Sequence, residues 1–221
     1  MPRQSAEKAG KAGAIRGRGG AHNRPRMHFT IFETPLVNDT MRALSLAVLR
    51  LQGWTVTGSL PPDTPKCVMI AAPHTSNWDL PYTLMVAFAL RLHVRWMGKA
   101  SIFRFPFGAL MRWLGGIAVD RSKASNTVQA SADALKAAVG PVQLVVPPEG
   151  TRGKTRHWKT GFYYIALEAG VPIVLAYMDY AKKESGLGPV FQPSGDIEAD
   201  MARIKAFYAG VKGRNADQFE A

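Results

Sequence analysis

Short apolar runs and longer segments with helical periodicity alternate along the chain between residues 66 and 177. The runs are brief and rich in β-branched residues, as in strands that are buried on both faces of a sheet. The segments between them carry apolar residues every three or four positions, which is the spacing of one face of a helix. The alternation predicts an α/β domain in which helices cover a mostly parallel sheet.

The bounds of these elements follow from the apolar patterns and from the glycines and prolines between them. We predict strands at residues 54–58, 67–72, 94–97, 117–119, 143–146 and 172–177. We predict helices at residues 36–52, 79–92, 106–114, 126–139, 161–168 and 197–211. Pro81 fits a helix only in its first turn, so the second helix begins near Asp79. Asn126 and Asp196 are expected to be N-caps.

The first predicted helix is amphipathic, and its apolar face has two possible partners. The apolar residues recur in steps of four and three, at Val37, Met41, Leu44, Val48 and Leu51. Such a face either packs on the core of the domain or lies on a membrane surface. The spacing alone leaves both interpretations open.

The charge is unevenly distributed along the chain. The protein has 221 residues and a net charge of +12, and residues 1–28 contain seven lysines and arginines against one acidic residue. This first segment has no apolar periodicity, so we expect a disordered basic tail before a single domain at residues 29–221. The tail is suited to anionic lipid or to RNA, and we expect no specific nucleic-acid function.

Several classes of protein are excluded by what the chain lacks. One cysteine, Cys67, leaves no internal disulfide and no cysteine-based zinc site, and its place in an apolar run favours a packing role. No secretory apolar region follows the basic start, and no apolar run reaches the roughly 18 residues of a membrane span. We therefore expect an intracellular protein that meets the membrane only peripherally, on its cytoplasmic face.

A histidine and an aspartate lie between the second predicted strand and the second helix. The turn reads Pro73-His74-Thr75-Ser76-Asn77-Trp78-Asp79. Strand-to-helix turns of α/β sheets line the crevice where ligands bind. A neutral imidazole there can take a proton near neutral pH, and a carboxylate on its other nitrogen would orient it. The alternative is structural: Asp79 caps the helix and His74 is a hydrogen-bonded loop residue.

A second polar stretch follows the strand at 143–146. Pro147-Pro148-Glu149-Gly150-Thr151-Arg152 comes directly after that strand, and Lys154, Arg156, His157 and Lys159 follow. We expect this turn to share the crevice with His74. Clustered cations beside a glycine turn suit a phosphate or another anion, and Arg152 is able to make paired contacts. The other interpretation is a solvated basic loop.

Together the two turns resemble the paired signature of the glycerolipid, or lysophospholipid, acyltransferase family. The first motif is His74-x-x-x-x-Asp79, and Pro148-Glu149-Gly150-Thr151-Arg152 follows about 70 residues later. Two further blocks are similar to the family in the same order, Gly116-Ile117-Ala118-Val119-Asp120-Arg121 and Val171-Pro172-Ile173-Val174. The likeness extends from about residue 53 to about residue 180 and implies a glycerolipid acyltransferase-like α/β fold.

The resemblance implies a mechanism. His74 would be the general base on an acceptor hydroxyl, which attacks the thioester carbonyl of acyl-CoA or of acyl-carrier protein, and Asp79 would orient the imidazole. No covalent acyl-enzyme, cofactor or metal is expected. The acceptor would be a lysophospholipid such as 1-acylglycerol-3-phosphate, and an anionic membrane surface would be a further partner.

The resemblance also assigns substrate-binding residues. Arg121, Glu149, Gly150, Thr151 and Arg152 match family positions that bind the glycerol-phosphate part of the acceptor, and Lys159 is a further candidate for the same anion. The acyl chain needs an apolar groove. Its candidate lining residues, each of which would otherwise belong to the core, are Trp78, Phe103, Phe107 and Trp113.

Two other functions remain open at this point. The same chemistry would serve a different lysolipid or an aminoacyl-lipid acceptor. The chain would otherwise be a non-catalytic basic module that binds nucleic acid or an anionic membrane, with affinity that falls steeply with salt.

Overall fold

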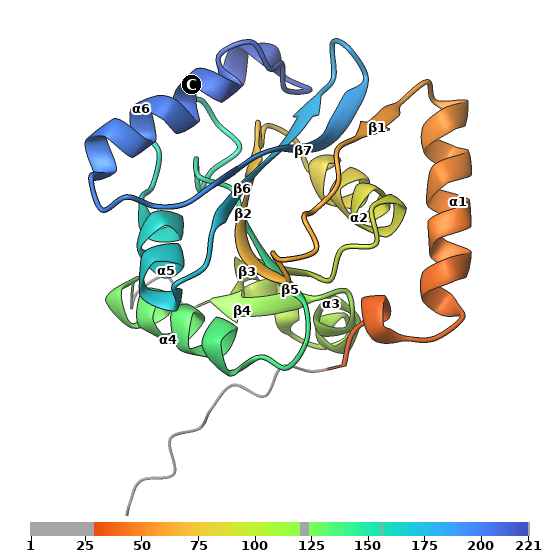
Figure 1. The fold of residues 1–221 in the computed structure, drawn as a ribbon. Helices are drawn as coiled ribbons and strands as arrows, with labels where there is room; N and C mark the ends of the chain where they lie inside the picture. Colours follow the sequence, from red (N-terminus) through yellow and green to blue (C-terminus); the bar gives the residue numbers. More distant parts are fainter. Residues whose placement is uncertain (1–28, 120–123, 156, 221) are drawn as a thin grey trace, which may run out of the picture.

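A computed structural model describes residues 29–119, 124–155 and 157–220. Its centre is a seven-stranded sheet with the order β1-β7-β6-β2-β5-β3-β4 (Figure 1). The strands are β1 Thr55–Thr57, β2 Lys66–Ala72, β3 Val94–Lys99, β4 Gly116–Val119, β5 Val142–Val146, β6 Ile173–Asp179 and β7 Glu184–Phe191. The α-helices are α1 Val37–Leu51, α2 Asp79–Ala89, α3 Gly108–Trp113, α4 Ala124–Ala137, α5 Gly161–Ala169 and α6 Ile197–Tyr208. Short 3-10 turns are η1 Ile31–Glu33, η2 Ala100–Phe103 and η3 Ala216–Gln218.

Most of the sheet is parallel. Strands β6, β2, β5, β3 and β4 pair in parallel, whereas β7 is antiparallel to β6 and β1 runs parallel to β7. The predicted mostly parallel α/β sheet is therefore confirmed. Because these five strands point the same way, their carboxyl ends lie at one edge, where open α/β sheets bind ligands.

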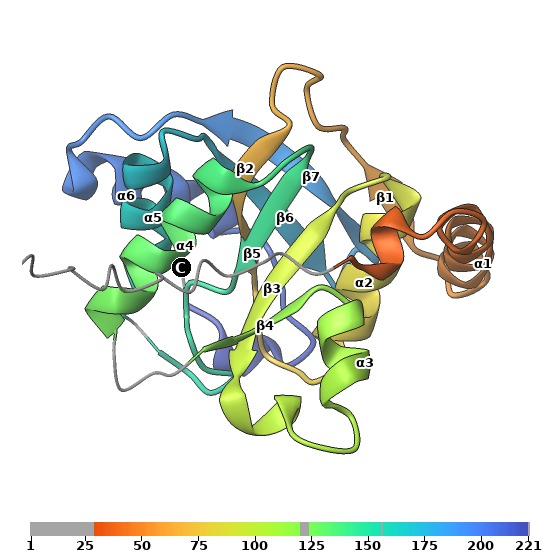
Figure 2. The same ribbon diagram turned by 90° about the horizontal axis from the view of Figure 1, so that it is seen from below.

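Helices cover both faces of the sheet (Figure 2). On one face Val68, Ile70 and Ala72 of β2 pack with residues of α4, α5 and α6. On the other face Cys67 and Met69 pack with α2, β3 and η1. Cys67 is fully buried, and burial raises the pKa of its thiol to about 12, in agreement with a packing role.

Strand β7 was not predicted. Its sequence, Glu184-Ser185-Gly186-Leu187-Gly188-Pro189-Val190-Phe191, lacks the apolar pattern of the other strands. Both of its glycines sit where other groups approach closely. A Cβ on Gly186 would be 2.0 Å from the Thr57 backbone oxygen, and one on Gly188 would be 2.4 Å from the Phe207 ring. The tertiary contacts of this strand therefore select small residues that carry no strand signal.

The helix ends differ from the predictions in detail. α2 begins at Asp79 as predicted, and Asp196 caps α6 by accepting a hydrogen bond of 3.1 Å from the Ala199 N–H. Asn126 is not an N-cap, because α4 already begins at Ala124. α6 ends at Tyr208, three residues earlier than predicted.

Helix α1 packs against α2, and its buried face agrees only in part with the predicted one, because Val37 and Met41 pack on the core whereas other predicted residues do not. Ser45 and Leu49 are buried, whereas Leu44 and Leu51 of the predicted inner face are exposed. The contact also includes Arg42, whose Nε donates a hydrogen bond to the Ala89 carbonyl at the end of α2. The core interpretation of this helix is confirmed, with its contact line rotated toward Ser45 and Leu49.

Candidate active site

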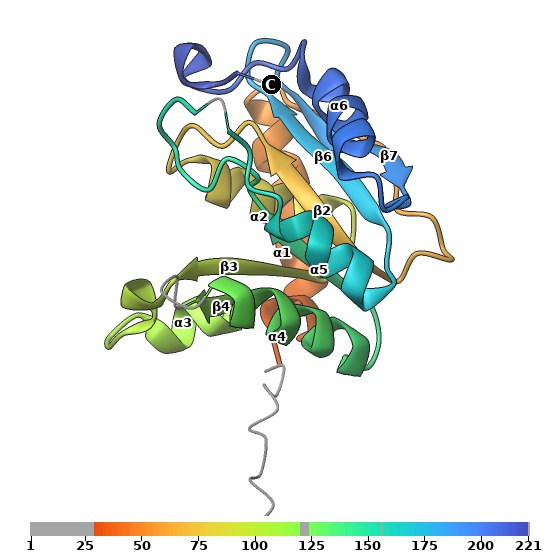
Figure 3. The same cartoon turned by 90° about the vertical axis from the view of Figure 1, so that its left-hand side faces the viewer.

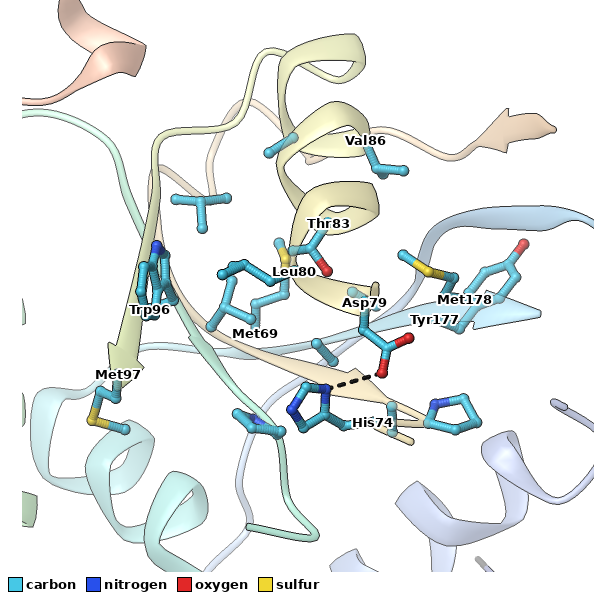
Figure 4. Close-up of a pocket in the computed structure, with 18 of the residues that line it drawn as sticks. Met69, His74, Asp79, Leu80, Thr83, Val86, Trp96, Met97, Tyr177 and Met178 are labelled. Atoms are coloured by element: carbon cyan, nitrogen blue, oxygen red, sulfur yellow. Dashed lines mark ion pairs between the residues drawn. The ribbon is translucent and has the colours of Figure 1, made fainter. Parts of the chain in front are cut away.

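The turn between β2 and α2 brings His74 and Asp79 together. His74 Nδ1 lies 3.1 Å from Asp79 Oδ2 (Figure 4). Asp79 is 5% exposed, and the imidazole is partly exposed at the mouth of a cavity. The predicted pairing of the two side chains is confirmed. Because Nδ1 faces the carboxylate, Nε2 is the nitrogen that is left to accept a proton.

Asp79 is held by donors other than the amides of its own helix. Its Oδ2 accepts the N–H groups of Thr75 at 2.9 Å and Ser76 at 2.8 Å. Its Oδ1 accepts a hydrogen bond of 2.8 Å from the hydroxyl of Tyr180. The N-cap position of α2 is Trp78, without a side-chain cap, so the interpretation of Asp79 as a helix cap is wrong. The carboxylate instead fixes the turn and orients the imidazole.

Tyr180 belongs to this site, and neither motif predicts it. It follows the last residue of β6, the strand that pairs with β2. Burial, together with the hydrogen bond to the Asp79 carboxylate, raises the pKa of Tyr180 far above its usual range, so the phenol remains a donor. Tyr180 could have been found by a chemical argument, because a buried carboxylate needs several hydrogen-bond donors and this tyrosine directly follows the strand that pairs with β2.

Glu149 connects the second motif to the first. Its Oε1 accepts the backbone N–H of His74 at 2.9 Å. The side chain is 5% exposed, and its Oε2 is buried without a hydrogen-bond partner in the described part of the chain. Burial raises the pKa of this carboxyl group. Glu149 does not line the cavity, unlike Gly150, Thr151 and Arg152, and its contact is with the backbone of His74.

The rest of the second motif lies at the mouth of the cavity, as predicted. Gly150, Thr151 and Arg152 line it together with His74, because β2 and β5 are neighbours with Ile70 opposite Val146. Lys159 lies against Gly150, since a Cβ there would be 2.8 Å from the lysine Cδ. Arg121 is outside the described residues.

Behind this polar mouth is an apolar cavity of about 490 Å³ between α2 and the sheet (Figure 4). The apolar lining residues include Met69, Leu80, Val86, Ala87, Leu92, Val94, Trp96 and Val145. The volume is within the usual range of small-molecule sites. A ligand with a polar group at the mouth and an apolar chain inside the cavity would match this arrangement of surfaces.

The aromatic residues predicted to line an acyl groove do not line this cavity. Phe103 is buried in the core, and Trp113 packs against the same cluster. Trp78 and Phe107 are exposed on the surface. The alternative core interpretation holds for Phe103 and Trp113, and neither interpretation holds for Trp78 and Phe107, because aromatic content does not reveal which face of an element borders a cavity. Trp96 and Met69 border it instead.

Comparison with known proteins gives the family. The family model described as Acyltransferase matches residues 55–179, more than half of the chain. The chain belongs to this acyltransferase family. The matched segment contains both motifs, strands β2 to β6 and most of the residues that line the cavity.

Curated acyltransferases resemble part of this chain. The 1-acyl-sn-glycerol-3-phosphate acyltransferase of Haemophilus influenzae is 31% identical over 108 residues, which are 46% of this chain and 43% of that protein. The enzyme of the same name from Salmonella typhimurium is 32% identical over 110 residues, 47% of this chain and 43% of that one. The aligned segment thus spans less than half of these relatives.

A solved structure has a similar fold. The 1-acyl-sn-glycerophosphate (LPA) acyltransferase PlsC from Thermotoga maritima superposes with a TM-score of 0.51 and 17% identity. The superposition covers 80% of this chain and 82% of that one.

The segment after α6 also contacts the turn that carries His74, and the motifs did not indicate these contacts. Asn215 Nδ2 donates to the Thr75 carbonyl at 2.8 Å, and the Asn215 N–H donates to Thr75 Oγ1 at 3.2 Å. The Arg214 guanidinium lies over the Trp78 ring at 5.5 Å and the Tyr180 ring at 5.9 Å. These contacts hold the histidine turn from a position 140 residues away along the chain.

Proposed function

We propose that this protein transfers a fatty acyl group from an acyl thioester to the hydroxyl of a lysophospholipid such as 1-acylglycerol-3-phosphate. The observation that carries the proposal is the His74–Asp79 pair at the mouth of an apolar cavity, beside a basic turn. The family match supports the type of chemistry. Residues 29–221 would act as one acyltransferase domain.

In the proposed reaction His74 Nε2 takes the proton of the acceptor hydroxyl as its oxygen attacks the thioester carbonyl. A new C–O bond forms, the C–S bond breaks, and the imidazolium gives its proton to the leaving thiolate. Asp79 keeps the ring in the tautomer that leaves Nε2 free and stabilises the imidazolium. Base catalysis of this kind contributes about 10² to 10⁴ in rate.

The two ends of the substrates would occupy different surfaces. The acyl chain would occupy the cavity between α2 and the sheet, where Met69, Val86 and Val94 form part of an apolar lining. The acceptor phosphate would meet Thr151, Arg152 and Lys159 at the mouth, and Lys99 at the end of β3 is a further cation on the cavity wall. Arg152 supports recognition of a phosphate because its guanidinium can make two parallel hydrogen bonds. The donor would be acyl-CoA or acyl-carrier protein.

The lipid acceptor suggests work at a membrane surface. None of the described helices is both long and apolar enough to cross a bilayer. The net charge of +12 supports attraction to an anionic surface. We propose peripheral association with the cytoplasmic face.

The test is the release of free thiol from acyl-CoA across a panel of lysolipid acceptors. His74→Ala should lower acyl transfer at least about 100-fold, because it removes the base. His157→Ala is the matched control, since this exposed histidine follows the same basic turn without lining the cavity. Circular dichroism and thermal melting should show both variants folded.

The results separate the proposed reaction from its alternatives. Full activity of a folded His74→Ala variant would defeat the mechanism. Thiol release with a different lysolipid or an aminoacyl-lipid acceptor, and none with 1-acylglycerol-3-phosphate, would move the proposal to that acceptor. No thiol release with any acceptor, together with salt-sensitive binding of nucleic acid or anionic vesicles, would indicate a binding module.

A further inference from the structure

An exposed apolar surface lies on the segment that joins β3 to β4. Phe105 is 96% exposed and Phe107 is 63% exposed, and Ile102 and Leu110 beside them are also exposed. We call these four residues the aromatic patch. Two neighbouring phenylalanines in water are unfavourable for a protein that acts alone, and such a patch usually marks a binding surface.

The aromatic patch is held outward by a well-packed base. Phe103 directly follows Ile102 in the chain. It is 5% exposed and packs against Trp96, with the two ring centroids 5.8 Å apart. The chain then turns so tightly that a Cβ on Gly108 would lie 2.0 Å from the Phe103 backbone oxygen. Phe103 therefore anchors this segment in the core, whereas Phe105 and Phe107 on the same segment are exposed.

The patch adjoins the mouth of the cavity. Ile102 is both a patch residue and a cavity-lining residue, and Lys99 just before it also lines the cavity. In Figure 3, α3 lies at the same end of the molecule as the tip of β3. An apolar surface in contact with the patch would therefore also lie next to the entrance of the proposed acyl site.

The surroundings of the patch are cationic. Between Lys99 and Val119 the sequence contains three basic residues, Lys99, Arg104 and Arg112, and no acidic residue. All three are exposed. Aromatic rings flanked by lysine and arginine are typical of surfaces that enter the headgroup region of an anionic bilayer.

We propose that the aromatic patch inserts into the interface of an anionic bilayer and sets the cavity mouth against it. A lysolipid would then reach His74 without leaving the membrane, so this inference rests on the proposed function. The competing surface is made by three exposed leucines, Leu44 and Leu51 on α1 and Leu36 just before it. We favour the patch because it adjoins the mouth, whereas none of these leucines lines the cavity.

The test compares two double variants by flotation with vesicles of equal parts phosphatidylcholine and phosphatidylglycerol. Phe105→Ser with Phe107→Ser should weaken partitioning about 100-fold, since burial of each phenyl ring is worth roughly tenfold or more. Leu36→Ser with Leu51→Ser is the matched control and should change partitioning less than about threefold if α1 stays in water. Ile102 is left unchanged because it lines the cavity.

Charge is tested separately. Arg104→Ala with Arg112→Ala should weaken binding to the anionic vesicles by roughly fivefold per arginine and leave binding to pure phosphatidylcholine vesicles unchanged. Equal losses on both kinds of vesicle would contradict the anionic preference and overturn this part of the proposal.

Activity distinguishes this inference from the proposed function. With a short-chain, water-soluble acceptor, the double variant Phe105→Ser with Phe107→Ser should turn over as fast as the unchanged protein. With the acceptor in vesicles, the same variant should lose its activity. Unchanged vesicle binding by the phenylalanine variant, or a loss confined to the leucine control, overturns the membrane proposal. The membrane proposal is also overturned if the phenylalanine variant still binds vesicles but no longer accepts acyl-carrier protein as the donor. Patch-dependent binding without any thiol release supports the docking surface while defeating the enzymatic proposal.

Discussion

The depth of the cavity leads to a quantitative prediction about acyl-chain length. Ala87 lines the cavity from α2 and is 1% exposed. It lies eight residues after Asp79, and at 1.5 Å per residue this places it about 12 Å farther along the helix. Figure 4 shows its neighbour Val86 at the end of the cavity away from His74. A larger side chain at position 87 should therefore shorten the cavity at this end, its floor, and leave the mouth beside His74 unchanged.

Ala87→Leu adds three carbon atoms at that floor. We expect it to displace roughly three methylene groups of the longest acyl chain that the cavity accepts. Each buried methylene is worth about 0.8 kcal/mol, so kcat/KM for that chain should fall by about 2.4 kcal/mol, or roughly 60-fold. A chain three carbons shorter should react at nearly the original rate, because it ends before the new side chain.

The assay is kcat/KM for a series of saturated acyl-CoA donors with one acceptor. Ala47→Leu is the matched control, since the same substitution then lies on the exposed side of α1. Thermal melting should confirm that both variants are folded. An unchanged chain-length profile in a folded Ala87→Leu variant would show that the acyl chain does not occupy this cavity.

Two further predictions concern the groups around the histidine. Tyr180→Phe removes one hydrogen-bond donor from Asp79, so the carboxylate should hold the protonated imidazole more tightly. The acidic limb of the pH profile of kcat/KM should therefore move to higher pH. If Tyr180 were only structural, the substitution would lower stability and leave that limb in place. Glu149→Gln keeps an oxygen for the His74 N–H and removes a buried charge. Because burial raises the pKa of Glu149 above its ordinary 4.5, folded-state stability of the unchanged protein falls as pH rises from that value through the raised pKa. The stability advantage of the variant, measured by urea unfolding, should grow over this interval, and a constant difference would contradict the argument.

The local sequence was sufficient for most elements and for the central pair. The β2 strand, the turn and the start of α2 were predictable because strand and helix patterns, and the position of Pro81, act over a few residues. The turn left two interpretations of His74 and Asp79 open, and the resemblance to the acyltransferase motifs favoured their pairing. The shared crevice of the two motifs followed from the rule that parallel strands end at one edge.

The tertiary structure alone decided what surrounds that pair. Tyr180, Glu149 and Asn215 reach the turn from 75 to 140 positions away, and their contacts depend on strand order and on the path of the chain after α6. No period along the chain encodes such distances. The face of α1 that packs, the cavity lining and the outward position of Phe105 likewise depend on how finished elements meet. Local patterns therefore determined the elements and the reactive pair, whereas long-range packing determined its supporting shell, the apolar cavity and the exposed aromatic patch.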